Sequence, residues 1–217
     1  MTTKAGRYRE FGKVTIGGKC IVDDDVIIGY PPKDVLLTKG TEHSLATKIG
    51  PRCVLRSGTV VYATSSLGAD VHLGHHVIIR EGVRVGDKSK IGSLTEIAPN
   101  VKVGKDCRIV GCSFIGNETV FGDHVFVAPG LVTVNRKFSP PFFERREDGE
   151  PMEPPEVGDH VLIGPNVTLS FGVRIGRRSI IASGCVVTKE VPPGSIVAGV
   201  PGRVVGSVTD KFGRGRT

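Results

Sequence analysis

Two kinds of polar residue recur at spacings that could bring their side chains together. Asn117 and Asn135 lie eighteen residues apart, and Glu118 follows the first of them. His124 and His160 also come to lie eighteen residues apart once an insertion between them is left out. Amides can hold a polar substrate, and a histidine can take up a proton near neutral pH. Whether these side chains meet depends on the elements that carry them.

An aliphatic or similar residue returns at every sixth position along most of the chain. This period runs from Ile49 to Val127, meets the polar Thr133, and resumes over residues 157–187. A shorter stretch over residues 16–28 keeps the same spacing. A six-residue period is the sequence signature of a parallel β-helix.

Three such hexads make one triangular coil of eighteen residues. The first and fifth positions face a narrow core, and the glycine that often follows the first position suits a tight corner. Coils stack at the strand spacing of about 4.8 Å, so each residue lies above the one eighteen positions earlier. The sequence therefore predicts three inner rows, beginning at Ile49, Leu55 and Val61, and it stacks Asn135 on Asn117. The same arithmetic stacks His160 on His124 once the insertion is left out.

Two segments interrupt the period, residues 30–48 and residues 136–156. The second contains five prolines and returns in register, so Val157 should stack on Phe121. Loops this long inside a compact fold are usually functional or disordered, and the aromatic residues of this one favour docking on a neighbouring subunit. Those aromatic residues are Phe138, Phe142 and Phe143.

These patterns predict an all-β protein, a parallel β-helix of hexapeptide repeats with a long external loop. One domain spans residues 1–205, and a basic tail covers residues 206–217. The period stops after Val187, so we expect a short C-terminal cap to close the stack there.

The charge of the chain favours an anionic partner. Its 217 residues carry a formal net charge of +7, with many basic residues late in the sequence. No RNA-binding signature and no basic stretch interleaved with aromatic residues is present, which argues against nucleic acid. No apolar run approaches the roughly 20 residues of a membrane span, so we expect a cytoplasmic protein with no membrane partner.

Most of the cysteines are expected to be small core residues and not metal ligands or disulfide partners. Four of the five occupy the fifth position of a hexad, where small side chains point inward. These four are Cys20, Cys53, Cys107 and Cys185.

A histidine cluster raises the alternative of a zinc site. His72, His75 and His76 fall on one coil, and some hexapeptide proteins are zinc carbonic anhydrases. The spacing His-x2-His-His lacks the two-histidine spacing with four intervening residues that those enzymes use, and no third ligand is evident. We therefore expect no metal.

Nearly the whole chain resembles the hexapeptide-repeat acyltransferase superfamily. Its strongest stretch, residues 157–205, VGDHVLIGPNVTLSFGVRIGRRSIIASGCVVTKEVPPGSIVAGVPGRVV, resembles the acyl-CoA-binding end of those enzymes. Residues 121–136, FGDHVFVAPGLVTVNR, resemble N-acetyltransferases that act on nucleotide-linked 3-amino sugars. Those enzymes usually read Asn-Asp at the end of this motif, whereas this chain has Asn135 and Arg136.

The resemblance implies a left-handed β-helix, although general crossover preferences would predict right-handed coils. It implies a homotrimer with clefts between adjacent subunits. Those clefts would bind acetyl-CoA as co-substrate and a nucleotide-linked amino sugar as acceptor. The implied reaction is attack of a neutral amine on the thioester.

The resemblance and the stacking together nominate residues for each role. His124 and Asn135 are the catalytic candidates, and the departing thiolate is the alternative proton acceptor to His124. The acceptor-binding candidates are Asn117, Glu118, His75, Arg80 and Arg136. The CoA-binding candidates are Gly164, Ala182, Ser183, Lys189, Gly199 and Arg203.

Each nomination competes with a plainer interpretation. Asn and Gly suit tight corners on conformational grounds alone, histidines can simply stack on a surface, and basic residues can form a solvated face. Three other functions remain open: an acyltransferase acting on a hydroxyl or a non-sugar amine, a zinc carbonic anhydrase, and a structural β-helix.

Overall fold

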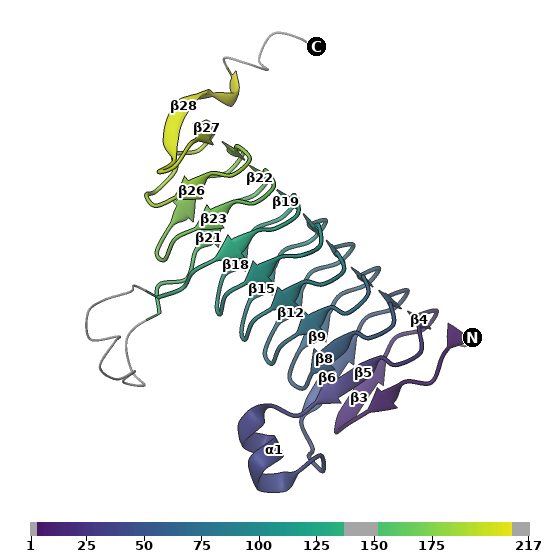
Figure 1. The fold of residues 1–217 in the computed structure, drawn as a ribbon. Helices are drawn as coiled ribbons and strands as arrows, with labels where there is room; N and C mark the ends of the chain where they lie inside the picture. The colour runs from purple at the N-terminus through teal and green to yellow at the C-terminus, as the bar shows by residue number, and fades with distance from the viewer. Residues whose placement is uncertain (1–3, 137–151, 210–217) are drawn as a thin grey trace.

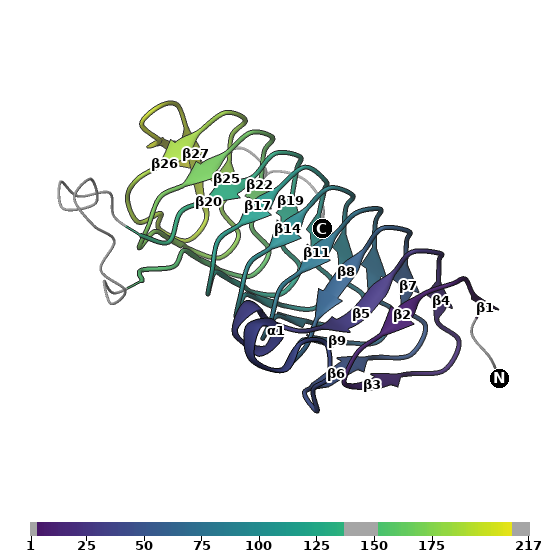
Figure 2. The same cartoon turned by 60° about the horizontal axis from the view of Figure 1, so that its bottom comes forward.

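The chain folds as a left-handed parallel β-helix, seen here in a computed structural model that describes residues 4–136 and 152–209 (Figure 1). Short strands stack into three long sheets around a triangular prism, and Figure 2 shows one of these sheets running along the prism. We name the sheets A, B and C in the order in which β4, β5 and β6 enter them. The edges are corner CA, corner AB and corner BC, after the two sheets that each edge joins in chain order.

Among the described residues, sheet A contains eleven strands, in stacking order β1 (Lys4–Ala5), β4 (Ile21–Val22), β7 (Val54–Leu55), β10 (His72–Leu73), β13 (Lys90–Ile91), β16 (Arg108–Ile109), β19 (Phe126–Val127), β22 (Leu162–Ile163), β25 (Ile180–Ile181), β27 (Ser195–Ala198) and β28 (Arg203–Ser207). Sheet B contains nine, β2 (Arg9–Glu10), β5 (Ile27–Tyr30), β8 (Val60–Tyr62), β11 (Ile78–Ile79), β14 (Glu96–Ile97), β17 (Phe114–Ile115), β20 (Val132–Thr133), β23 (Thr168–Leu169) and β26 (Val186–Val187). Sheet C contains eight, β3 (Lys13–Ile16), β6 (Ala46–Ile49), β9 (Ser66–Leu67), β12 (Arg84–Val85), β15 (Lys102–Val103), β18 (Val120–Phe121), β21 (Glu156–Val157) and β24 (Arg174–Ile175).

The predicted inner rows are confirmed. In a typical two-residue strand the second residue is buried and the first faces outward, because successive side chains of a strand point to opposite faces. Ile49 pairs in register with Leu67, one coil away. Across the long loop Phe121 pairs with Val157, so the chain returns without a shift of register. Phe138, Phe142 and Phe143, and most of the basic tail, lie outside the described residues.

The corners are built from residues with a positive φ angle. His124 and His160 adopt φ values of 59° and 58° at corner CA, a conformation that L-residues rarely adopt outside turns. The glycine that opens the same corner has no room for a side chain. A Cβ on Gly122 would lie 2.2 Å from Oδ1 of Asp159, which accepts a hydrogen bond from the backbone N–H of Asp123.

The stack extends further towards the N-terminus than the period indicates. β1 and β2 pair with β4 and β5, although Lys4, Arg9 and Glu10 in these strands are charged. The first interruption is also narrower than residues 30–48, because Tyr30 ends β5 and Ala46 begins β6. Between them stands a short exposed helix, α1 (Lys33–Lys39), which projects from the prism (Figure 1). His43 anchors the returning chain, with Nε2 3.0 Å from the carbonyl oxygen of Gly29 and Nδ1 accepting the N–H of Leu45.

The stack also continues beyond Val187, where we expected it to end. Val191 bridges to Ile175, and β27 pairs with β25, each with a spacing of sixteen residues in place of eighteen. The shortened coil hides this continuation from a search for the six-residue period. β28 then runs antiparallel to β27 and forms the cap.

The four cysteines at fifth positions are buried and free, as predicted, and Cys112 is exposed. Burial raises the pKa of Cys53 to about 11 and raises the pKa values of Cys107 and Cys185. A buried thiol that stays protonated is inert. These cysteines therefore fill the core. None of the described helices is long and apolar enough to cross a membrane.

Candidate functional site

Corner BC brings Asn117 and Asn135 together, as the stacking predicts. The side-chain amide of Asn135 donates to the carbonyl oxygen of Asn117 at 3.4 Å. Its Nδ2 also lies 3.5 Å from Sδ of Met152, in the chain that returns from the long loop. The backbone N–H of Glu153 donates to the carbonyl oxygen of Asn135 at 2.9 Å. The two ends of the loop therefore meet over Asn135 and leave it half-buried.

Glu118 and Arg136 lie at the same corner, and both are half-buried. Glu118 has a φ of 61° and its backbone N–H donates to the carbonyl oxygen of Pro99. Arg136 is the last described residue before the loop. The corner thus gathers two amides, one carboxylate and one guanidinium group, a set that can bind a polar ligand in several orientations.

A buried hydroxyl network supports this corner from inside the prism. Thr133 Oγ1 accepts the N–H of Gly116 at 2.7 Å and lies 3.1 Å from Thr119 Oγ1, whose hydroxyl donates to the carbonyl oxygen of Gly116 at 2.7 Å. Every polar atom of this set has a partner, as burial requires. The polar residue that interrupts the inner row therefore fixes the backbone beneath Asn117.

Arg80 lies at corner BC but is engaged elsewhere. Its guanidinium forms two hydrogen bonds with the carboxylate of Glu81, at 2.9 and 3.1 Å, and lies 4.6 Å from the ring centroid of Tyr62. These hydrogen bonds raise the pKa of Arg80. By the stacking Arg80 lies two coils below the corner of Asn117, roughly 10 Å at the usual strand spacing. The structure does not bring it to the asparagines.

His124 occupies corner CA, a different edge of the prism. Its ring stacks on that of His160, with centroids 4.7 Å apart and planes 7° from parallel, which confirms the predicted stacking. Nδ1 of His124 lies 3.9 Å from Oδ2 of Asp106 on the preceding coil, and the imidazole is exposed. The arrangement can orient an imidazole next to a carboxylate and present it to solvent, as a general base requires. Within one chain, however, it lies on another edge than Asn135.

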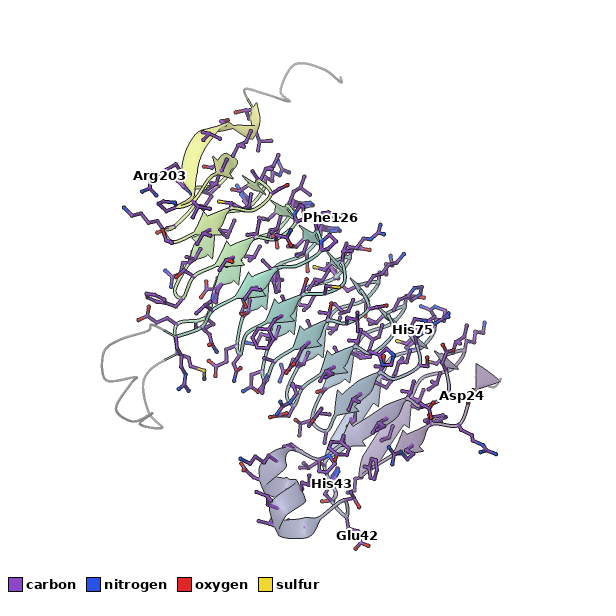
Figure 3. All side chains as sticks on the ribbon, viewed as in Figure 1. Asp24, Glu42, His43, His75, Phe126 and Arg203 are labelled. Carbon is purple, nitrogen blue, oxygen red and sulfur yellow. The ribbon has the colours of Figure 1, made fainter. Side chains whose placement is uncertain are left out.

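His75 occupies the third edge, corner AB. Its Nδ1 lies 3.0 Å from the hydroxyl of Ser57, and its backbone N–H donates to the hydroxyl of Ser93. Figure 3 shows it on the long side of the prism that also carries Phe126. The structure does not join His75 to either His124 or Asn135 within one chain.

The residues nominated for CoA lie at the C-terminal end, most of them along corner AB. Gly164 and Ala182 follow the paired strands β22 and β25, and Gly199 follows β27, which pairs with β25. Arg203 pairs with Ala198 across β27 and β28, beside the same edge, and Figure 3 places it at that end. Ser183 and Gly199 are exposed, as are Lys189 and Arg203, but Lys189 belongs to corner BC and stands apart.

Comparison with known proteins supports the family. The family model described as bacterial transferase hexapeptide (six repeats) matches residues 82–117 and 154–189. The family model described as hexapeptide repeat of succinyl-transferase matches residues 66–93. The matched residues carry hexapeptide repeats of the kind that these transferase models describe, which supports the hexapeptide-repeat acyltransferase superfamily.

Individual members resemble parts of this hexapeptide-repeat protein. Galactoside O-acetyltransferase of Escherichia coli is 41% identical over 42% of this chain and 44% of its own length. The aligned region therefore spans less than half of that relative. A hexapeptide-repeat acetyltransferase of Vibrio cholerae, solved in complex with acetyl coenzyme A, is 30% identical over 58% of this chain and 70% of that one, with a TM-score of 0.40.

A third protein resembles the fold over almost the whole length. UDP-N-acetylglucosamine acyltransferase from Campylobacter jejuni covers 99% of this chain and 79% of its own, with a TM-score of 0.61. Its sequence identity is 14%, so the likeness concerns the architecture of the coils alone.

The three histidines weighed as zinc ligands do not converge. His72 lies on the outer face of sheet A, while His75 and His76 lie at corner AB. Across residues 4–136 and 152–209, no three His, Cys, Asp or Glu side chains are placed to hold a metal ion.

Two features of this hexapeptide-repeat protein escaped the sequence analysis. One is the aromatic column Phe11–Tyr30–Tyr62, with ring centroids 5.8 and 5.4 Å apart, which leads to Arg80. The shifted register at β5 hides its spacing. The other is a row of cations along sheet A, described below, whose eighteen-residue spacing could have been read from the sequence.

Proposed function

We propose that this protein transfers an acetyl group from acetyl-CoA to the amino group of a nucleotide-linked amino sugar, as a homotrimer. The observation that carries the proposal is corner BC, where Asn135 lies over Asn117 under the returning end of the long loop. This corner holds the motif that resembles sugar N-acetyltransferases, and it supplies amides that suit sugar hydroxyls.

The chemistry requires few protein groups. The neutral amine attacks the thioester carbonyl, the C–N bond forms, the C–S bond breaks, and one proton leaves the nitrogen. The site must hold the amine at the carbonyl and stabilise the developing oxyanion. We assign the proton to His124, which Asp106 would orient, with the departing thiolate as the competing acceptor.

A trimer reconciles the positions of the candidates. Asn135 and His124 lie on different edges of one prism, so a single site can contain both only if each comes from a different subunit. Outward-facing apolar side chains on sheets A and B are suited to such contacts, since exposed apolar patches mark interaction surfaces. They include Phe114, Phe126, Val132 and Leu162. Analytical ultracentrifugation should give the mass of three chains, and a monomer would exclude a shared site.

Acetyl-CoA would lie along the last coils of corner AB. The small residues Gly164, Ala182, Ser183 and Gly199 leave a strip for the pantetheine arm, and Arg203 beside them offers a fork for a phosphate. Lys189 could reach the same coenzyme only from another edge, so we expect it to act across the subunit interface.

A thiol-release assay tests the proposal directly. Acetyl-CoA is incubated with a panel of nucleotide-linked 3-amino and 4-amino sugars, and free thiol is measured with time. We expect release with at least one amino sugar and none with the corresponding hydroxy sugars. Absence of thiol release together with absence of CoA binding by calorimetry would overturn the proposal.

O-acetylation is the second candidate, because the chain resembles a galactoside O-acetyltransferase over residues that make up 42% of its length. The same assay decides between the two when galactosides and other simple sugars are added to the panel. Release with a galactoside but with no amino sugar would replace the first proposal by the second.

A further inference from the structure

A basic groove runs along the outer face of sheet A. It has a volume of about 320 Å³ and lies over β10, β13 and β16. Its polar wall consists of His72, Lys90 and Arg108, which are in register: His72 pairs with Lys90 and Lys90 pairs with Arg108. The corner glycines that follow β10 and β13, Gly74 and Gly92, also line it. These three side chains therefore point outward at the strand spacing of about 4.8 Å.

These cations are free to bind a ligand. Among the described residues neither Lys90 nor Arg108 takes part in an ion pair, whereas Arg56 at the end of the groove is held by Asp23 at 2.9 Å. Carboxylates at the adjoining corner CA are engaged by other groups, and among them Asp87 accepts the backbone N–H of Ala69. Asp70 binds Arg52 at 2.6 Å, and Asp106 lies 3.9 Å from the imidazole of His124. An anion would thus meet an excess of positive charge.

The groove starts beside the coil that carries His124. Arg108 pairs with Phe126, and His124 precedes Phe126 by two residues at the adjoining corner. From there the cations continue towards the N-terminus, one coil at a time, on the side of the prism that Figure 3 marks with Phe126 and His75. A ligand whose reactive group lies at His124 would place its next group over Arg108.

The order of groups in the proposed acceptor fits this order of residues. A nucleotide-linked 3-amino or 4-amino sugar carries its amine at C3 or C4, the diphosphate on the anomeric carbon C1, and the nucleoside beyond the diphosphate. Two phosphates in succession match two cations on successive coils, and Arg and Lys both form strong charge-assisted hydrogen bonds with phosphate oxygens. We propose that Lys90 and Arg108 bind the diphosphate of the acceptor and that the groove directs its nucleoside towards His72.

This inference rests on the proposed function for the identity of the ligand, but its test does not. Binding of UDP and dTDP is measured by isothermal titration calorimetry to the wild type and to the double variant Lys90→Ala/Arg108→Ala. Each lost charge-assisted contact should weaken binding about tenfold or more, because hydrogen bonds between charged groups are the strong ones. The affinity for acetyl-CoA, which also contains a diphosphate, should stay within twofold.

The matched control is Arg84→Ala/Lys102→Ala, which removes two exposed cations that are likewise paired in register, but on sheet C. This control should bind UDP and dTDP like the wild type. Lys90→Arg should retain most of the binding. Equal thermal midpoints of the variants would show that any difference is not caused by misfolding.

The outcomes separate the groove from the reaction. Equal weakening in both double variants, or no nucleoside diphosphate binding by the wild type, would overturn the groove as a diphosphate site. Loss of acetyl-CoA affinity alone would assign the groove to the coenzyme and overturn the inference. Selective loss of UDP or dTDP binding would support the groove even if no amino sugar released thiol, in which case only the proposed reaction would fail.

Discussion

The inner rows and the outer faces of this β-helix differ although they share the same strands. In β13, Ile91 is buried and Lys90, its neighbour in the chain, is exposed. Inside, the next coil repeats the same kind of residue, here Ile109, whereas outside a row can change from the cation Arg108 to the aromatic Phe126. Close packing in the core restricts the residue types of the inner rows, whereas exposure to solvent leaves the residues of the outer faces free to vary. The fold depends on the inner rows, and the proposed chemistry depends on the outer ones.

The sharpest test of this comparison replaces each of the two residues of β13 by alanine in a separate variant. Ile91→Ala should lower the free energy of unfolding by about 2–5 kcal/mol, because it leaves a cavity in a narrow core. Lys90→Ala should change it by no more than about 0.5 kcal/mol. Urea titrations at one protein concentration measure both. Similar losses for the two variants would mean that the outer row contributes to the fold.

His124→Asn tests the outer corner as chemistry. Asn tolerates the positive φ of this position, so the change removes the imidazole with little strain. If His124 is the base, turnover at saturating acetyl-CoA should fall about a hundredfold, the low end of the usual contribution of general-base catalysis. His160→Asn, which alters the stacked partner, should have a much smaller effect. Activity of His124→Asn that is retained across neutral pH would assign the proton to the departing thiolate.

The core contains two buried threonines, Thr133 and Thr95, that allow a finer test. Thr133→Val should cost about 1–3 kcal/mol, since it leaves the buried N–H of Gly116 without a partner. Thr95→Val should be neutral or stabilising, because Thr95 Oγ1 is buried and finds no hydrogen-bond partner among the described residues. Denaturation midpoints compare the two. Equal losses of unfolding free energy in the two variants would show that side-chain volume, and not the hydrogen-bond network, determines the stability at these positions.

Asn135→Ala tests corner BC. The change removes the amide that meets Asn117 and Met152 but touches none of the residues nominated for CoA. We expect turnover to fall about tenfold, the equivalent of roughly 1.4 kcal/mol, with the affinity for CoA nearly intact. Asn100→Gly removes another amide from corner BC at a position whose φ of 61° glycine tolerates, and should leave turnover unchanged. A parallel loss of CoA affinity in Asn135→Ala would mean that the acceptor site lies elsewhere.

The inner rows could be predicted from the sequence because one physical rule governs every coil. Counting in eighteens placed Phe121 against Val157 across the long loop and His124 against His160, and the structure agrees in both cases. The prediction failed where the rule changes. At the C-terminal end a coil of sixteen residues carries the stack past Val187, and at the N-terminus β1 and β2, which lack the apolar repeat, extend it.

The site was harder to predict, because the stacking shows which residues share an edge of the prism but not which partners their side chains bind. Asn117 and Asn135 meet as expected, but Arg80 was nominated without knowledge that Glu81 and Tyr62 engage it. The eighteen-residue spacing of His72, Lys90 and Arg108 is visible in the sequence. Basic residues are common at outward-facing strand positions, however, so the spacing alone does not indicate a site. Only the groove beside it distinguishes this row from Arg84 and Lys102 on sheet C.

The smallest expected effect concerns an exposed ion pair at corner CA. Hydrogen bonds from Arg52 hold the pKa of Asp70 below its ordinary value. The pair therefore stabilises the folded state above the ordinary pKa of the carboxyl group, and this contribution disappears as the pH falls through the lowered pKa. Arg52→Ala should return the pKa of Asp70 towards about 3.9 in an NMR titration. Lys88→Ala removes a charge on the next coil that acts on Asp70 more weakly, so this variant should shift the pKa of Asp70 less. If both variants shift the pKa equally, general surface charge and not the paired geometry sets it, and this corner would then resemble any solvated face.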